Sequence, residues 1–157
     1  MGTMGCGKST IGEGLTQRIN AAYLEGDDFH PAENKEKMAA GIALNDDDRW
    51  PWLKALSEAM RNTSGKVVTS CSSLKRSYRD FITAGAGEPV LFVHLAGTKE
   101  LLAARLSDRQ GHFMNTDLLD SQLQALEPPG KDEFSLTVNI DATVNQILGQ
   151  IETLIER

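Results

Sequence analysis

The sequence has no long apolar run, no excess of positive charge and only two cysteines, and each of these features argues against a class of protein. No run approaches the roughly 20 apolar residues that a membrane-spanning helix needs. The formal net charge of −6 argues against nonspecific binding to nucleic acid or to anionic membranes. Cys6 and Cys71 show no metal-ligand spacing, and no secretory signal is visible. These features predict a cytoplasmic protein with two reduced thiols.

Repeats, low-complexity segments and linkers long enough to divide domains are also lacking. The 157 residues are 40% hydrophobic and 24% charged, which is ordinary for a soluble globular protein. A chain of this length can bury a substantial core. We therefore expect one domain that spans residues 1–157.

The first motif is the stretch Gly2–Ser9, which reads G-x-x-x-x-G-K-S and matches the phosphate-binding loop of P-loop proteins. Its backbone N–H groups and the amino end of a helix starting near Lys8 favour a bound phosphate. Lys8 adds a cation near the β- and γ-phosphates, and the Ser9 hydroxyl can bind Mg²⁺. The predicted ATP-binding residues are Gly2, Thr3, Met4, Gly5, Cys6, Gly7, Lys8, Ser9 and Thr10.

One feature of this motif is unusual, because only Met1 precedes Gly2. A P-loop normally follows a buried strand that holds it at the carboxyl edge of a sheet. Either an N-terminal strand is missing from this sequence or the loop lacks its usual support.

Strand and helix patterns alternate along the rest of the chain. Hydrophobic spacing and end signals predict helices over Lys8–Ile19, Pro31–Ala40, Pro51 to just before Ser64, Leu74–Ala84, Thr98–Arg109, Leu118–Leu126 and from Thr143 onward. Short apolar runs predict strands over Ala22–Glu25, Lys66–Cys71, Val90–Leu95 and Leu136–Ile140. This alternation predicts an α/β fold, a parallel sheet with helices on both faces.

Two charged clusters follow the first strands. Asp27 lies in the stretch Glu25–Pro31, at the carboxyl end of a strand, where its carboxylate can accept a proton from a substrate hydroxyl or hold Mg²⁺ through water. Arg49 lies in Leu44–Trp52 and can clamp a carboxylate with two hydrogen bonds. The alternative for both clusters is a solvated acidic turn, with the two tryptophans serving only to pack.

Two pairs of cations lie at helical spacing further along. Lys75 and Arg79 share one helix face, which suits an acidic substrate or is simply exposed. Arg105 and Arg109 also share a face and lead into the polar segment 110–115. That segment can close over ATP, bring an arginine to the γ-phosphate and exclude water. Alternatively, the second pair is a surface feature.

Together these stretches resemble the gluconokinase family of small P-loop kinases, which are relatives of shikimate kinase and adenylate kinase. The resemblance runs nearly from end to end. The matching stretches are Gly5–Thr10, Gly26–Pro31, Asn34–Met38 with Gly41, Leu44–Arg49 with Pro51–Leu53, Cys71–Lys75 with Tyr78–Asp80, Gly111–Met114, Leu118-Leu119, Ser121-Gln122 and Leu126–Pro129. The combination of His-Pro, Asp-Asp-Asp-Arg and Gly-His-Phe-Met is specific to this family, whereas the P-loop is widely shared.

The resemblance implies ATP- and Mg²⁺-dependent phosphorylation of the terminal hydroxyl of D-gluconate, which gives 6-phosphogluconate. It also implies a three-layer α/β/α fold with a parallel sheet of order 2-3-1-4-5, a lid over about 109–117 and a homodimer. By analogy, Asp27 is the base or orienting group and Arg105 and Arg109 meet the phosphates. The implied substrate contacts are Asp27, His30, Arg49, Lys75, Arg79 and His112.

The chain departs from the family pattern in two ways. Glu25 stands where the family commonly has Asp, so the longer side chain changes how Mg²⁺-bound water is held. The family also has a hydrophobic strand before the P-loop, and in the implied order this strand is central. We therefore expect the native protein to carry roughly ten more N-terminal residues, a typical strand with a short lead.

The sequence leaves two other functions open. A kinase for a different small sugar acid would need the same cations, because sequence alone does not rank the stereochemistry of hydroxyl groups. A catalytically inactive nucleotide-binding module would need only the P-loop.

Overall fold

The computed structural model describes residues 1–110 and 116–156. The helices are α1 (Lys8–Ile19), α2 (Ala32–Ala39), α3 (Asp46–Asn62), α4 (Arg76–Ala86), α5 (Lys99–Gln110), α6 (Thr116–Ala125) and α7 (Val144–Ile155), with a short 3₁₀ helix, η1 (Gly26–Phe29). The strands are β1 (Ala22–Glu25), β2 (Val67–Ser70), β3 (Phe92–Ala96) and β4 (Ser135–Asn139). All four predicted strands are therefore present, and they alternate with helices as expected.

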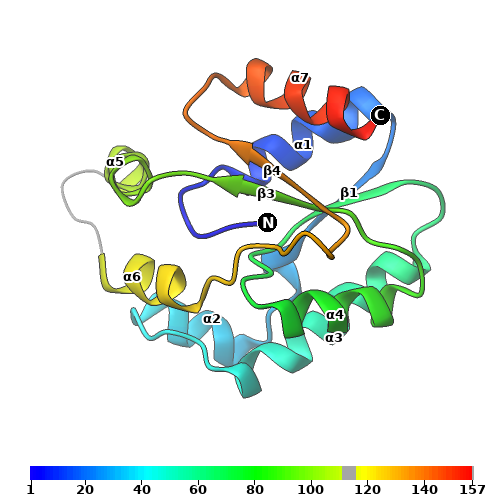
Figure 1. Cartoon of the computed structure of the whole chain (residues 1–157). Helices are drawn as coiled ribbons and strands as arrows, with labels where there is room; N and C mark the ends of the chain where they lie inside the picture. The colour runs from blue at the N-terminus through cyan, green and yellow to red at the C-terminus, as the bar shows by residue number, and fades with distance from the viewer. Residues whose placement is uncertain (111–115, 157) are drawn as a thin grey trace.

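The helices lie on both sides of the strands. Figure 1 shows α1 and α7 above them, and α3 and α4 below. Each side has its own apolar core. The core under α1 and α7 includes Ile11 and Ile147, and the core of α3 and α4 includes Leu56 and Ile82, all at most 5% exposed. This layering confirms the predicted α/β class.

The strands form two parallel pairs. Strand β1 pairs with β2, with Ala22 opposite Val67, and β3 pairs with β4, with Phe92 opposite Ser135. In the order 2-3-1-4-5 that the resemblance implies, strand 1 is the strand before the P-loop. The pair β1–β2 therefore corresponds to strands 2 and 3 of that order, and the pair β3–β4 corresponds to strands 4 and 5. Within the described residues, no backbone ladder joins β2 to β3.

Met1 lies between the two pairs. Its amino group donates to the Val93 carbonyl at 2.5 Å, and its carbonyl accepts from the Leu95 N–H at 2.9 Å. On the other side, the Gly2 N–H donates to the Ser72 carbonyl at 3.1 Å. Met1 and Gly2 thus connect the β3 side to the end of β2, and they hold the P-loop at the carboxyl ends of the strands.

A cavity of about 700 Å³ lies alongside Met1. Its lining includes apolar side chains from β2, β3, α1 and α7, for example Val68, Val93, Leu15 and Ile151. Met1 is among the lining residues, and its backbone is hydrogen-bonded to β3.

One helix begins earlier than the sequence pattern predicts. Pro51 was expected to open the helix, but α3 begins at Asp46 and contains Pro51. The reason is a capping box, in which the Asn45 side chain accepts from the Asp48 N–H at 2.8 Å and the Asp48 carboxylate accepts from the Asn45 N–H at 3.0 Å. The acidic run Asp46–Asp48 is therefore the first turn of a helix, where negative charge is favourable, and not a free turn.

Two further expectations concern the lid and membrane-spanning helices. The expected lid over 109–117 falls largely on residues 111–115, which lie outside the described residues. In the part that the structure describes, no helix is long and apolar enough to cross a membrane.

Candidate active site

The phosphate-binding loop wraps around the amino end of α1. Gly7 precedes this helix in the left-handed conformation (φ 91°), which glycine adopts readily, and no side chain caps the first turn. The first amide hydrogens of α1 are therefore available to an anion. Lys8 extends back over the loop, and its Nζ donates to the Thr3 carbonyl at 3.1 Å. Gln122 of α6 accepts from the Met4 N–H at 2.6 Å, which ties α6 to the same loop.

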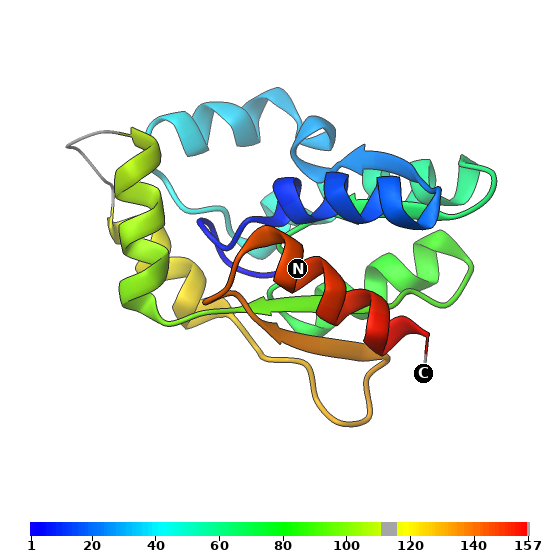
Figure 2. The same ribbon diagram turned by 90° about the horizontal axis from the view of Figure 1, so that it is seen from above.

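Arg105 of α5 lies beside this loop. A Cβ atom built on Gly7 would lie 3.9 Å from its Nη1, and its Nη2 donates to the Ile140 carbonyl at 2.6 Å. Figure 2 shows α5 at the same end of the molecule as the P-loop. Arg109 follows one turn later and is exposed. Of the two predicted phosphate contacts, the structure thus brings Arg105 to the loop, and Arg109 lies further along the same helix.

Glu25 brings carboxylate oxygens to the Ser9 hydroxyl. Ser9 Oγ donates to Glu25 Oε2 at 2.6 Å, Tyr23 Oη donates to the same atom at 2.9 Å, and Ser70 Oγ donates to Oε1. Burial alone would raise the pKa of Glu25, but these three hydrogen bonds outweigh it and lower the pKa below its usual value. Glu25 is therefore a carboxylate at neutral pH.

These oxygen atoms fit a hard divalent cation. Mg²⁺ in kinases is held by one or two protein oxygens together with phosphate oxygens and water, rather than by a cage of protein ligands. The Ser9 hydroxyl and the Glu25 carboxylate provide such a pair next to the P-loop. Among the described residues, no cluster of three His, Cys, Asp or Glu side chains could hold a metal ion by itself.

Asp27 follows β1 on η1, near enough to the P-loop for the charge of Lys8 to act on its carboxyl. The backbone at Gly26 passes so close to β2 that an added Cβ would lie 1.9 Å from the Ser70 carbonyl oxygen. Only glycine fits there, and this close approach fixes where Asp27 emerges. The Asp27 side chain is 79% exposed. Desolvation by the surrounding protein nevertheless raises the pKa of its carboxyl, the positive charge of Lys8 opposes the rise, and Glu25 adds to it.

His30 lies behind Asp27 and is 7% exposed. Its ring stacks on Trp52, with centroids 3.9 Å apart, and Trp52 Nε1 donates to the Gly26 carbonyl at 2.7 Å. The His30 Nε2 atom lies 3.8 Å from Asp27 Oδ1. Burial, with the positive charges of Arg49 and Lys35, lowers the pKa of His30 to about 4. His30 is therefore neutral at physiological pH.

Arg49 is a buried cation whose hydrogen bonds are incomplete. It is 8% exposed, and its Nη2 donates to the Leu44 carbonyl at 3.4 Å. Its Nε has no hydrogen-bond partner among the described residues. The guanidinium carbon lies 5.3 Å from the centre of the Tyr78 ring. A buried donor without an acceptor is costly, so this group is suited to receive an anionic ligand.

Lys75 is close to Arg49 but already has a partner. Its Nζ donates to Asp46 Oδ1 at 3.0 Å, and the Tyr78 hydroxyl donates to the same carboxylate. Nζ also lies 5.6 Å from the centre of the Tyr78 ring. Lys75 therefore contributes positive charge beside the Tyr78 ring while it anchors the first turn of α3.

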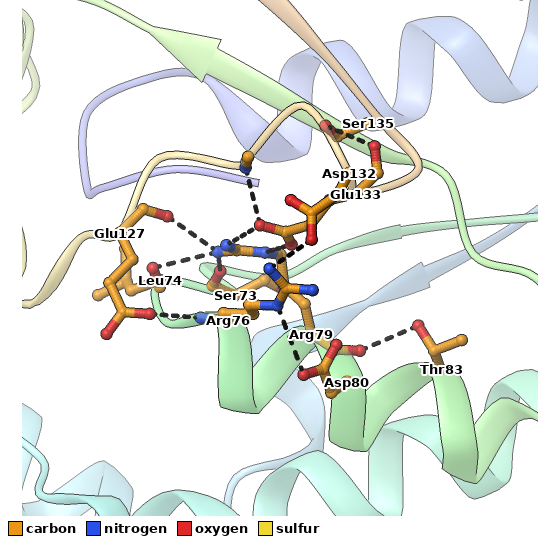
Figure 3. Close-up of polar contacts among 11 residues, drawn as sticks. Ser73, Leu74, Arg76, Arg79, Asp80, Thr83, Glu127, Asp132, Glu133 and Ser135 are labelled. Carbon is orange, nitrogen blue, oxygen red and sulfur yellow. Dashed lines mark hydrogen bonds and ion pairs between the residues drawn. The ribbon is translucent and has the colours of Figure 1, made fainter.

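Arg79 differs from the other predicted substrate contacts. It is 1% exposed, and its guanidinium forms two hydrogen bonds with Glu133 and donates to the carbonyls of Ser73, Leu74 and Glu127 (Figure 3). All of its hydrogen-bonding groups point at the protein itself. Its surroundings favour a structural role over the predicted contact with substrate. His112, the remaining predicted contact, lies outside the described residues.

The structure thus brings Asp27, His30 and Arg49 near one another, and the charge of Lys8 acts on the Asp27 carboxyl. Lys75 lies beside the Tyr78 ring that Arg49 also approaches. Sequence reasoning did not assign roles to Trp52, which stacks on His30, or to Gln122, which binds the P-loop. Both contacts join segments that are far apart in the sequence, so no local pattern could have predicted them.

Comparisons with known proteins show the family to which this chain belongs. The shikimate kinase family model matches residues 4–146. A probable gluconokinase of Xenopus tropicalis is 40% identical over 100% of this chain and 92% of its own length. The thermoresistant gluconokinase of Escherichia coli K12 is 39% identical over 100% of this chain and 91% of its own.

A solved structure of a gluconokinase is also similar to this chain. The crystal structure of a gluconokinase from Sinorhizobium meliloti 1021 superposes with a TM-score of 0.85 at 40% identity, covering 99% of this chain and 93% of that one. The chain therefore belongs to the gluconokinase family of P-loop kinases, within the broader group that the shikimate kinase family model describes.

Proposed function

We propose that this protein transfers the γ-phosphoryl group of ATP to the terminal hydroxyl of D-gluconate and forms 6-phosphogluconate. Membership of the gluconokinase family supports the reaction. The observation that carries it is a set of three groups. These are the P-loop with Lys8, whose charge acts on Asp27, the exposed carboxylate of Asp27, and the buried guanidinium of Arg49, whose charge acts on His30 beside Asp27.

The nucleotide end of the proposed site uses the P-loop, from Gly2 to Thr10. The uncapped amides of α1 and the Lys8 ammonium receive the β- and γ-phosphates. Arg105 lies beside Gly7, where it can neutralise charge that develops on the transferred group. Arg109 is proposed as a second phosphate contact from the same helix. Ser9 and Glu25 would hold Mg²⁺, which would supply positive charge to balance that of the phosphates.

The acceptor end uses Asp27. In the proposed step, the terminal hydroxyl oxygen of gluconate forms a bond with the γ-phosphorus as the bond from that phosphorus to the β-phosphate oxygen breaks. ADP leaves with the electrons of the broken bond, and the Asp27 carboxylate accepts the hydroxyl proton. The exposed position of Asp27 leaves room for a hydroxyl at hydrogen-bond distance.

The carboxylate end of gluconate is proposed to bind Arg49. Its unpartnered Nε and partly used Nη2 offer a planar pair of donors, which suits a carboxylate. Lys75 adds positive charge from across the Tyr78 ring. His30 is proposed to donate a hydrogen bond from its neutral ring to the substrate. A homodimer and a lid over about 109–117 stay predictions of the family resemblance.

An ADP-release assay with purified protein tests this function against the alternatives. Gluconate, other six-carbon sugar acids and shikimate are each supplied with ATP and Mg²⁺. We expect the highest kcat/KM with gluconate. A higher value with another sugar acid would favour the second function, and ATP binding without turnover on any acceptor would favour the inactive module. Lys8→Ala is the matched control, and its turnover should fall to background.

A further inference from the structure

Asn34 is a buried amide that touches His30 but lies outside the sites assigned above. It belongs to the first turn of α2 and is 3% exposed. Its Nδ2 lies 2.8 Å from the Asp48 carbonyl oxygen and 3.2 Å from His30 Nδ1. The side chain therefore bridges α3 and the histidine behind Asp27.

The Asp48 carbonyl determines which way the amide points. A carbonyl oxygen can only accept, so the atom of Asn34 that faces it must be the NH₂ nitrogen and not the oxygen. One hydrogen of that NH₂ group is directed at Asp48. The second faces His30 Nδ1, which must then be the unprotonated, accepting nitrogen of the ring. A neutral histidine with an accepting Nδ1 carries its hydrogen on Nε2.

The ring is fixed in place as well as in tautomer. It lies nearly parallel to Trp52, at an interplanar angle of 21°, and Trp52 also holds the Gly26 carbonyl. Nε2 is thereby directed towards Asp27, with 3.8 Å between Nε2 and Oδ1. The charged groups near His30 are Asp27 on η1, Arg49 on α3 and Lys35 on α2. The two cations disfavour a second proton on the ring, which keeps a lone pair on Nδ1 for Asn34.

We infer that Asn34 is a positioning residue that holds His30 in the Nε2–H tautomer, so that this N–H faces Asp27 and the acceptor hydroxyl. The inference rests on the proposed function. At 3.8 Å the N–H forms no hydrogen bond with Oδ1, but its dipole favours the ionised carboxylate and leaves Oδ2 to accept the substrate proton. The opposite tautomer would turn a lone pair towards the carboxylate, which would repel it and move it out of line.

Nitrogen-15 NMR of the wild-type protein tests the tautomer directly and needs no substrate. Long-range ¹⁵N–¹H correlations distinguish Nε2–H, Nδ1–H and the doubly protonated ring, and a His30→Gln sample identifies the His30 signals. We expect the Nε2–H pattern from pH 5.5 to 8. A Nδ1–H pattern, or a doubly protonated ring at pH 7, would overturn the inference whether or not gluconate is phosphorylated.

The variant Asn34→Asp tests the consequence. Its carboxylate only accepts, so His30 must carry a hydrogen on Nδ1, and its pKa should rise. We expect kcat with gluconate to fall about tenfold, KM for ATP to stay within twofold, and the pH profile of kcat to gain an ionisation between pH 5 and 8. Unchanged kcat together with an unchanged pH profile would contradict the positioning role.

Two further variants control this experiment. Asn145→Asp makes the same chemical change on α7, on the opposite side of the strands from α2 (Figure 1), and should leave kcat unchanged. If Asn34→Asp does not fold, Asn34→Leu removes both donors without adding a buried charge. It should give a mixture of His30 tautomers and a lower kcat, and a pure Nε2–H pattern in this variant would refute the role of Asn34. Wild-type protein with the Nε2–H pattern but no activity on gluconate would instead reject the proposed function.

Discussion

Arg79 and Glu133 form a buried bidentate ion pair across 54 residues of chain, with 2.6 Å between Nε and Oε2 and 2.9 Å between Nη2 and Oε1. Their side chains are 1% and 9% exposed. Hydrogen bonds with Arg79 lower the pKa of Glu133 to about 2. The pair fastens α4 to the segment between α6 and β4, as Figure 3 shows.

We predict that Glu133→Gln destabilises the protein without weakening gluconate binding. Loss of one partner leaves the Arg79 charge buried and uncompensated, which typically costs about 3–5 kcal/mol. Urea unfolding measures this loss, and KM for gluconate should stay within twofold. Asp80→Asn is the control, because it removes only an exposed pair with Arg76, and its effect should be below about 0.5 kcal/mol. A small loss of stability with a tenfold rise in KM would instead make Arg79 a substrate contact.

Arg49→Met should raise KM for gluconate while it leaves KM for ATP unchanged. A charged hydrogen-bonding pair contributes about 2 kcal/mol, which corresponds to roughly 30-fold in KM, and kcat should change less than threefold. Steady-state kinetics with varied gluconate measures both values. Arg61→Met, at the exposed end of α3, is the matched control and should behave as wild type. If Arg49→Met lowers kcat and leaves KM unchanged, the proposed contact with the substrate carboxylate is wrong.

Asp27→Asn should abolish most turnover and spare nucleotide binding. The amide has nearly the same shape but cannot take the hydroxyl proton, so kcat should fall about 10²- to 10⁴-fold. Isothermal titration should find the ATP affinity within threefold of wild type. Asp28→Asn changes the neighbouring exposed carboxylate and should keep kcat within twofold. Wild-type kcat in Asp27→Asn would remove this residue from the reaction.

His30 should make folding stability depend on pH in the acid range. Its pKa is about 4 in the folded protein and 6.5 in its unperturbed state, so as pH falls the unfolded chain takes up the proton first. The contribution of neutral His30 is therefore complete above about pH 6.5 and is lost as the pH falls from 6.5 to 4.

A comparison of wild type with His30→Gln separates the effect of His30 from that of the carboxyl groups, which both proteins share. Between pH 7.5 and 4.5, wild type should lose about 2.5 kcal/mol more free energy of unfolding than His30→Gln. Urea unfolding at both pH values provides the four numbers. Parallel losses in the two proteins would show that His30 does not have a lowered pKa.

Local signals in the sequence predicted much of the fold. The apolar spacing of Lys8–Ile19, the short run Ala22–Glu25 and the Thr143–Gln146 capping box all match the structure. The predicted start of α3 at Pro51 was wrong, because the Asn45–Asp48 capping box begins the helix at Asp46 and the helix contains Pro51. Elements set by neighbouring residues are readable in this way.

Contacts between the site residues and distant parts of the chain could not be predicted from the sequence. Lys8 and Asp27 each belong to a motif that indicates a catalytic role, whereas the helical spacing of Arg79 suits the protein surface equally well. Its partner Glu133 and the carbonyl of Glu127 are brought to it only by the folded chain. The stacking of Trp52 on His30 and the approach of Arg105 to Gly7 depend in the same way on packing between distant segments.

The most direct test of the proposed reaction is to identify its product. The wild-type protein is incubated with ATP, Mg²⁺ and D-gluconate, and the product is examined by ³¹P–¹H correlation NMR. Phosphate on the terminal carbon couples to methylene protons, whereas phosphate on an inner carbon couples to a single methine proton. We predict one phosphorylated product, 6-phosphogluconate, and none with Lys8→Ala. A phosphate on any other carbon, or ATP consumed without a phosphorylated sugar acid, would contradict the proposed function.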